Sequence, residues 1–97
     1  MVERKSRRVV ERVQTGVRLE RRILLVLKAL AAEKQMTLGD LIEGIVLHAF
    51  EGAVPFGPAS RATIETLKKV YRLDFGARDS HLLVERAPRL TRQRRAR

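Results

Sequence analysis

The residues best suited to recognise another molecule lie on the polar face of one short stretch, residues 12–19. Polar and apolar residues alternate there in the order Val13, Gln14, Thr15, Gly16, Val17, Arg18 and Leu19. This period of two predicts a β-strand with one apolar face. A two-stranded ribbon fits the DNA major groove, where arginine reads guanine and glutamine reads adenine. Arg18 and Gln14 are therefore predicted to contact bases.

A lone strand leaves its backbone groups unpaired, so this strand requires a partner. The rest of the sequence holds no second strand of comparable quality. We therefore expect the same strand of a second copy to pair with it, which gives an intermolecular antiparallel ribbon and a homodimer.

Positive charge is concentrated near both ends of the sequence. The 97 residues carry a net charge of +10, of which residues 1–12 supply +3 and residues 86–97 supply +6. Basic segments of this kind suit a polyanion, either a nucleic acid or an anionic membrane surface, although they also serve solubility alone. The ribbon favours nucleic acid, and Arg12 is expected to contact phosphate or a base.

Nothing in the sequence resembles a catalytic centre or a cofactor site. Cysteine is absent, and His48 and His81 lack partners at metal-ligand spacing. The triplet Asp74-Phe75-Gly76 matches part of a kinase signature, but the chain is too short for a kinase, so we interpret it as a helix end. We expect no enzyme, metal or cofactor. The apolar runs are too short for a signal peptide or a membrane span, which indicates a cytoplasmic, nucleoid-associated protein.

Two amphipathic helices are predicted to follow the strand. Glu20 opens the first, which runs from about residue 20 to 34, and Thr37 caps the second, from about 38 to 50. Gly52 is its expected stop. A helix-turn-helix reader is disfavoured, because the exposed face of the second helix is acidic and lacks lysine and arginine.

The remaining sequence predicts a loop at residues 53–59 and two more helices. The third helix is capped by Ser60 and covers about residues 61–73, and a short fourth one covers about 79–86. The predicted organisation is a basic arm (1–11), a dimerisation and DNA-binding domain (12–52), a helical extension (53–88) and a basic tail (89–97). The extension offers a surface for a protein partner.

The order strand, helix, Thr-capped turn and helix resembles the ribbon-helix-helix family of DNA-binding repressors. The motifs Val17-Arg18-Leu19 and Thr37-Leu38-Gly39-Asp40-Leu41-Ile42 carry the resemblance, which covers under half of the chain. It implies a mainly α fold, an intertwined homodimer whose paired strands enter the major groove, with C-terminal helices added here. Base contacts would come from Gln14, Gly16 and Arg18. Backbone amides of Thr37, Leu38 and Gly39 would hold a phosphate, as helix N-termini commonly do.

These observations favour a sequence-specific, dimeric transcriptional repressor that binds double-stranded DNA. The alternatives are an antitoxin whose extension blocks a toxin, a plasmid-partition protein, and a nonspecific nucleoid or RNA-binding protein. A nonspecific binder would bind all duplexes alike and depend steeply on salt.

Overall fold

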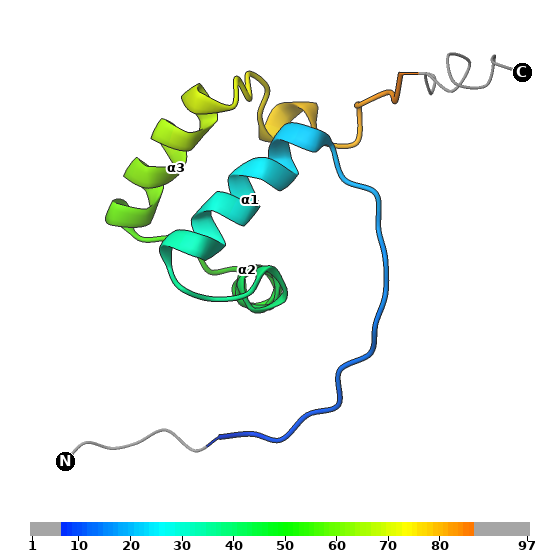
Figure 1. The fold of residues 1–97 in the computed structure, drawn as a ribbon, viewed down its shortest axis with the longest axis vertical. Helices are drawn as coiled ribbons and strands as arrows, with labels where there is room; N and C mark the ends of the chain where they lie inside the picture. The colour runs from blue at the N-terminus through cyan, green and yellow to red at the C-terminus, as the bar shows by residue number, and fades with distance from the viewer. Residues whose placement is uncertain (1–6, 87–97) are drawn as a thin grey trace, which may run out of the picture.

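Three helices of equal length form the folded body of the protein. The computed structural model describes residues 7–86. Helix α1 spans Arg21–Glu33, α2 spans Leu38–Phe50 and α3 spans Pro58–Val70, and a single 3₁₀ turn, η1, follows at Ala77–Asp79. Helix α1 lies in the middle and packs against both α2 and α3 (Figure 1).

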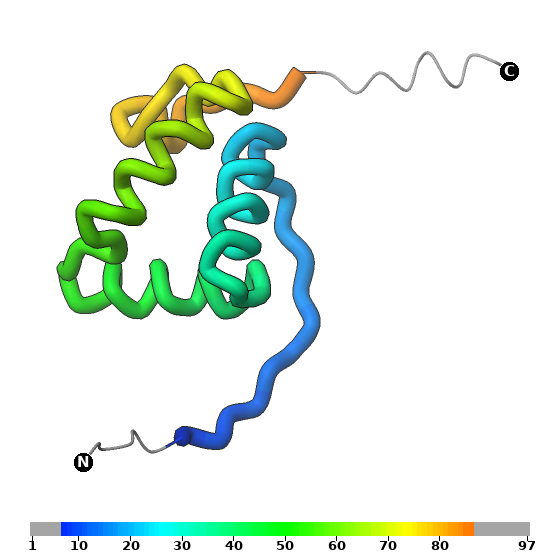
Figure 2. The backbone as a smooth tube through the Cα atoms, turned by 60° about the vertical axis from the view of Figure 1, so that its left-hand side comes forward, coloured from blue at the N-terminus to red at the C-terminus, as the bar shows by residue number. Residues whose placement is uncertain are grey.

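The predicted ribbon-helix-helix fold is wrong, because residues 7–86 contain no β-strand. Residues 7–19 form an extended segment that leaves the body of the molecule and pairs with no other described backbone (Figure 2). Val13 and Val17, the supposed buried face, are each 75% exposed. Alternating side chains favour extended backbone, but a sheet also requires a second row of donors and acceptors. No described segment supplies one.

The core is small and centres on Leu30 of α1. Leu30, Ala31 and Leu41 are buried together. Five half-buried residues surround them: Leu27, Ile45, Phe56, Ile64 and Leu67. Because these side chains come from all three helices and the loop before α3, the core holds the body together.

The first two helices begin where the sequence predicted. Thr37 Oγ1 accepts a hydrogen bond from the Asp40 amide at 3.0 Å. Helix α3 begins earlier than predicted, with Gly57 as N-cap and Pro58 at the first position, where the fixed φ of proline is favourable. Ser60 is therefore not the cap, and its hydroxyl instead accepts a hydrogen bond from Lys34 Nζ at 2.7 Å.

Each helix ends at a residue in the left-handed conformation. Gln35, Gly52 and Arg72 have φ values of 58°, 73° and 58°. The residue after each donates its amide to a carbonyl five positions back, as in Met36 to Ala31 at 3.0 Å. These are Schellman-type ends, which satisfy carbonyls that the helix itself leaves unpaired. The predicted stop at Gly52 is confirmed.

The fourth helix predicted at residues 79–86 is absent. Only η1 is helical in this part, and residues 81–86 are non-helical and exposed. The amide of Gly76 donates to Asp79 Oδ2 at 3.0 Å, which closes η1 as a local turn. No helix within residues 7–86 is both long enough and apolar enough to span a membrane.

Glu20 is expected to stabilise the start of α1 in a pH-dependent way. Its carboxylate accepts hydrogen bonds from the amides of Arg22 and Ile23 at 2.8 and 3.1 Å. Burial raises the pKa of Glu20, but the hydrogen bonds donated by Arg22 and Ile23 outweigh it and bring the pKa below its ordinary value of 4.5. The ionised cap is thus favoured in the folded state.

We expect Glu20→Ala to lower the free energy of unfolding by about 1 kcal/mol at pH 7. The unfolded chain binds the proton more readily, so the contribution is complete above pH 4.5 and is lost as the pH falls through the lower folded value. Urea unfolding at pH 7 and pH 3 measures the difference. Glu33→Ala, which removes the same charge from the other end of α1, is the control. An equal loss at both pH values would contradict the ionised cap.

Candidate nucleic-acid interface

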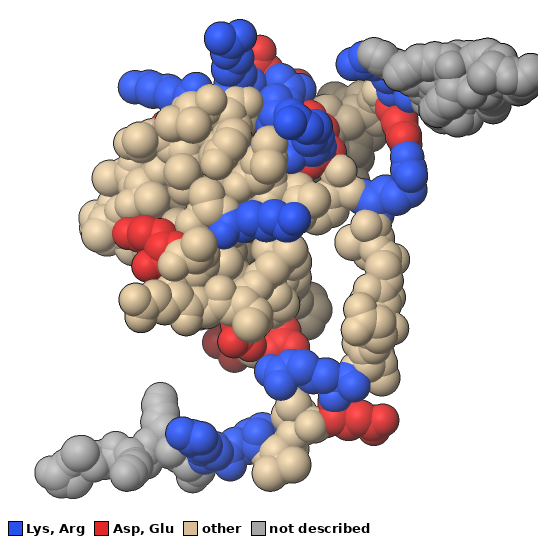
Figure 3. Space-filling model, in the orientation of Figure 1, with Lys and Arg blue, Asp and Glu red and all other residues tan. Residues whose placement is uncertain are grey.

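An open groove lies between the extended segment and the end of the described chain. It has a volume of about 1030 Å³. Four arginines line it: Arg18 from the extended segment, Arg21 and Arg22 from the beginning of α1, and Arg86. We call this the arginine groove. Figure 3 shows basic side chains gathered near the beginning of α1 and again along the extended segment.

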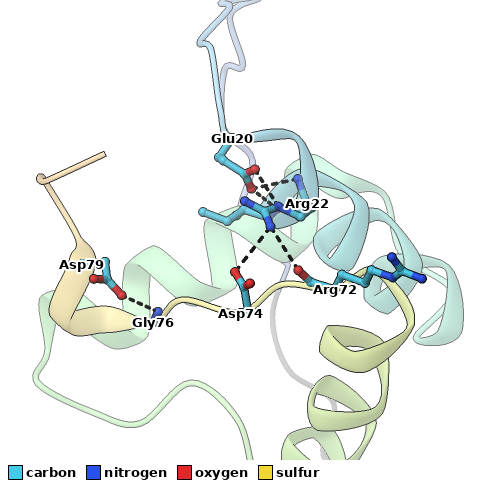
Figure 4. A network of polar contacts seen from close by, with 7 residues as sticks. Glu20, Arg22, Arg72, Asp74, Gly76 and Asp79 are labelled. Carbon is cyan, nitrogen blue, oxygen red and sulfur yellow. Dashed lines mark hydrogen bonds and ion pairs between the residues drawn. The ribbon is translucent and has the colours of Figure 1, made fainter. Parts of the chain in front are cut away.

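Arg22 connects the beginning of α1 to the loop after α3. Its Nε donates to Glu20 Oε2 at 2.9 Å, and its Nη1 donates to the Arg72 carbonyl at 3.1 Å and to Asp74 Oδ1 at 3.4 Å (Figure 4). The guanidinium also lies 5.1 Å from the centre of the Phe75 ring, within cation–π range. These contacts fix the loop after α3 against the beginning of α1 and thereby form one wall of the groove.

The other arginines of the groove present exposed side chains. Arg18 forms an ion pair with Glu85 across the groove, and both side chains are largely exposed. Arg21 has no ion-pair partner among residues 7–86. Water screens an exposed pair strongly, so phosphate oxygens can replace Glu85 at little cost. The groove therefore combines a fixed wall with arginines that can exchange partners.

Arg12 lies at the other end of the extended segment, against α2. Its Nε and Nη2 donate to the two carboxylate oxygens of Glu43 at 2.9 and 2.7 Å, and Asp40 Oδ1 is 3.8 Å from Nη2. The hydrogen bond from Arg12 lowers the pKa of Glu43, and the same bond raises the pKa of Arg12 above its ordinary value. The bidentate geometry is the one that arginine also uses for phosphate.

The predicted phosphate site at the beginning of α2 is close to this pair. Thr37 and Gly39 are exposed and Leu38 is half-buried. The first amides of a helix lack intrahelical partners, which suits an anion. Asp40 and Glu43 put negative charge beside them, however, and this charge opposes a phosphate.

The predicted base-contacting residues all lie in the extended segment, but this segment is not part of a sheet. Gln14 and Gly16 are exposed, and nothing lies within 4 Å of a Cβ built on Gly16. The structure thus brings Arg18 into the arginine groove and Arg12 to α2, with Gln14 and Gly16 exposed between these two anchor points. The first six residues of the predicted arm and the predicted tail at 89–97 lie outside the described residues.

Sequence reasoning missed the grouping of Arg21, Arg22 and Arg86 with Arg18. The run Arg18-Leu19-Glu20-Arg21-Arg22 held a signal, because three arginines within five residues mark a charged patch. It also missed Phe75, which was interpreted only as part of a helix end. Its contact with Arg22 depends on the loop after α3 returning to the beginning of α1, which no local pattern indicates.

No protein-family model, curated protein or solved structure matches this chain. Among residues 7–86, no three His, Asp or Glu side chains gather closely enough to hold a metal ion. His48 instead makes a 2.7 Å hydrogen bond between its Nδ1 and the Gly44 carbonyl, within α2. The arginine groove and the adjoining extended segment are the candidate site.

Proposed function

We propose that this protein binds double-stranded DNA as a homodimer and acts as a sequence-specific transcriptional repressor. The observation that carries the proposal is the exposure of Arg18, Arg21 and Arg86 along one groove of a chain with net charge +10. Arginine side chains on a groove of this kind match the spaced phosphates of a nucleic-acid backbone.

The extended segment supports contacts to bases as well as to phosphates. A single extended chain is narrow enough to follow a DNA groove, and basic arms of other proteins bind in this way. Gln14 is exposed, and among residues 7–86 Arg18 pairs only with the exposed carboxylate of Glu85. In this proposal Gln14 and Arg18 contact base edges, while Arg21 and Arg86 contact phosphates.

The exposed apolar face of α2 supports the homodimer. Val46, Leu47, Phe50 and the following Val54 expose large side chains, and contiguous exposure of this kind marks an interaction surface. The charges beside this face do not oppose a second copy, because Asp40 and Glu43 of α2 pair with Arg12 of the same chain. Two apolar α2 faces can therefore pack together while each copy keeps these pairs.

The proposal predicts a loss of DNA affinity when Arg18 and Arg21 are replaced together. We expect Arg18→Ala/Arg21→Ala to weaken binding to a selected duplex by about tenfold or more near physiological salt. The slope of log affinity against log salt should fall by about one, since Arg21 supplies one of the proposed phosphate contacts and Arg18 a base contact. Selection from a random duplex pool, followed by fluorescence anisotropy at several salt concentrations, measures both effects.

The matched control is Arg61→Ala/Lys69→Ala, which removes the same charge from exposed positions on α3 outside the groove. An equal loss in both double variants would mean that net charge alone drives binding. If the selection enriched no motif, the proposal of specific repression would be wrong, and nonspecific binding by the basic segments would take its place.

A protein partner for the segment after α3 is a second candidate, as an antitoxin role would require. Leu82 and Val84 are 71% and 92% exposed, and two neighbouring exposed aliphatic side chains suit a partner surface. A stoichiometric complex with a toxin that Leu82→Asp dissociates, without any change in DNA affinity, would distinguish this role from DNA binding.

A further inference from the structure

A second cavity lies between α1, α3 and the loop that contains η1, and it shares Phe75 and Leu83 with the lining of the arginine groove. Its volume is about 320 Å³. Its walls are apolar and comprise Ile23 and Val26 of α1, Ile64 of α3, and Leu73, Phe75 and Leu83 from the chain after α3. We call it the apolar pocket. Its size is at the lower end of the range for small-molecule sites.

Among the residues that the structure describes, Lys68 is the one charged residue that lines the apolar pocket. Its side chain is only 33% exposed, and its Nζ is 3.6 Å from Glu65 Oε2. We infer that the methylene stem lies along the pocket and that the ammonium reaches its mouth, because a part-buried lysine keeps its charged end in water. Glu65 is 63% exposed and lies outside the lining, so its pair with Lys68 is screened and easily exchanged.

An apolar cavity with a single cation at its mouth selects an amphipathic anion. The apolar part of such a ligand removes the pocket walls from water, and its anionic group replaces Glu65 on Lys68. A second protein chain would need a larger and flatter surface, and a nucleic acid would place phosphates against apolar walls. A pocket of about 320 Å³ has room for a short aliphatic chain.

We propose that the apolar pocket binds a small amphipathic carboxylate, with its chain between α1 and α3 and its carboxylate on Lys68. Carboxylate binding in the apolar pocket does not rest on the proposed DNA binding. The test of one proposal can therefore fail while the other holds. The probe is octanoate, and octan-1-ol and octylamine match its chain length but lack the negative charge.

The test is a titration of the full-length protein with each probe, followed by methyl NMR. Octanoate should shift the methyl resonances of Ile23, Val26 and Ile64, and should bind more tightly than octan-1-ol or octylamine. Lys68→Gln should raise the Kd for octanoate about fivefold and leave the Kd for octan-1-ol unchanged. Lys69→Gln is the matched control, because it removes the same charge from the next residue, which does not line the pocket.

Three outcomes would overturn the proposal. Equal affinity for octanoate and octan-1-ol would remove the role of Lys68, and so would an equal effect of Lys68→Gln and Lys69→Gln. Octanoate shifts confined to Leu47 and Val46 would place the probe on the exposed face of α2 instead. Circular dichroism of Lys68→Gln establishes that the variant is folded, so that a loss of octanoate binding reports on the site.

Discussion

Replacing Leu30 with alanine should lower the free energy of unfolding by about 3 kcal/mol. Leu30 is 1% exposed and packs at the centre of a core to which all three helices contribute. Only four apolar side chains are buried within residues 7–86, so few neighbours can relax into the space that the substitution leaves. Urea unfolding followed by circular dichroism measures the loss.

The matched control is Leu82→Ala, which makes the same chemical change at an exposed position. It should change the free energy of unfolding by less than about 0.5 kcal/mol. A midpoint of thermal unfolding that falls by about 15 °C in Leu30→Ala and stays constant in Leu82→Ala would be the corresponding thermal result. If the two variants lost equal stability, the three helices would not share the core described here.

Phe50→Asp should convert the proposed homodimer into a monomer. Phe50 is the last residue of α2 and is 80% exposed, the most exposed of the large apolar side chains of that helix. A carboxylate at this position would be buried between two copies without a partner, and aromatic side chains contribute strongly to interfaces. We expect the dimer Kd to rise about a hundredfold or more. Sedimentation equilibrium over a range of protein concentrations measures it.

Val70→Asp is the control for this effect, because Val70 is also largely exposed but lies at the end of α3. It should leave the dimer Kd unchanged, and both variants should keep their helical circular dichroism. A wild-type protein that remains monomeric at high concentration would refute the dimer. A separate measurement of DNA affinity would then show whether a single copy of the protein binds DNA.

The boundaries of the first two helices could be predicted because their signals are local. Glu20 and Thr37 accept hydrogen bonds from amides two or three residues ahead, and Gly52 ends α2 in the left-handed conformation. Each signal depends on neighbouring residues only, so the sequence contains the whole interaction. Both helices agree with their predictions to within one residue at each end.

The strand could not be predicted correctly, because a strand is defined by its partner. Alternation from Val13 to Leu19 is compatible with any extended chain, whether it is paired or exposed. In residues 7–86 the extended segment is held by side-chain ion pairs instead, through Arg12 and Arg18. Arg12 pairs with a residue 31 positions away and Arg18 with one 67 positions away, and such separations have no local signature.

The prediction of a fourth helix was wrong for a different reason. Leu82, Leu83 and Val84 suggested an apolar stripe, but they are consecutive and so point to different sides of a helix. With only a short turn at Ala77–Asp79 before them, these residues had no helix to extend. Leu83 and Val84 instead line the arginine groove. Their position depends on the packing of the loop after α3 on α1, which a local sequence pattern does not indicate.

The two anchor points of the extended segment have a consequence for how quickly it can change shape. Residues 13–17 form an arch whose ends are fastened by Arg12 on Glu43 and Arg18 on Glu85, away from the core (Figure 1). Ordering backbone costs about 1–2 kcal/mol per residue, and screened surface pairs oppose this cost only weakly. The arch should therefore detach and reattach on the fast timescale of loops, nanoseconds to microseconds, and not as a slow rearrangement. In the proposed DNA complex, Glu43 and Glu85 would compete with the nucleic acid for Arg12 and Arg18.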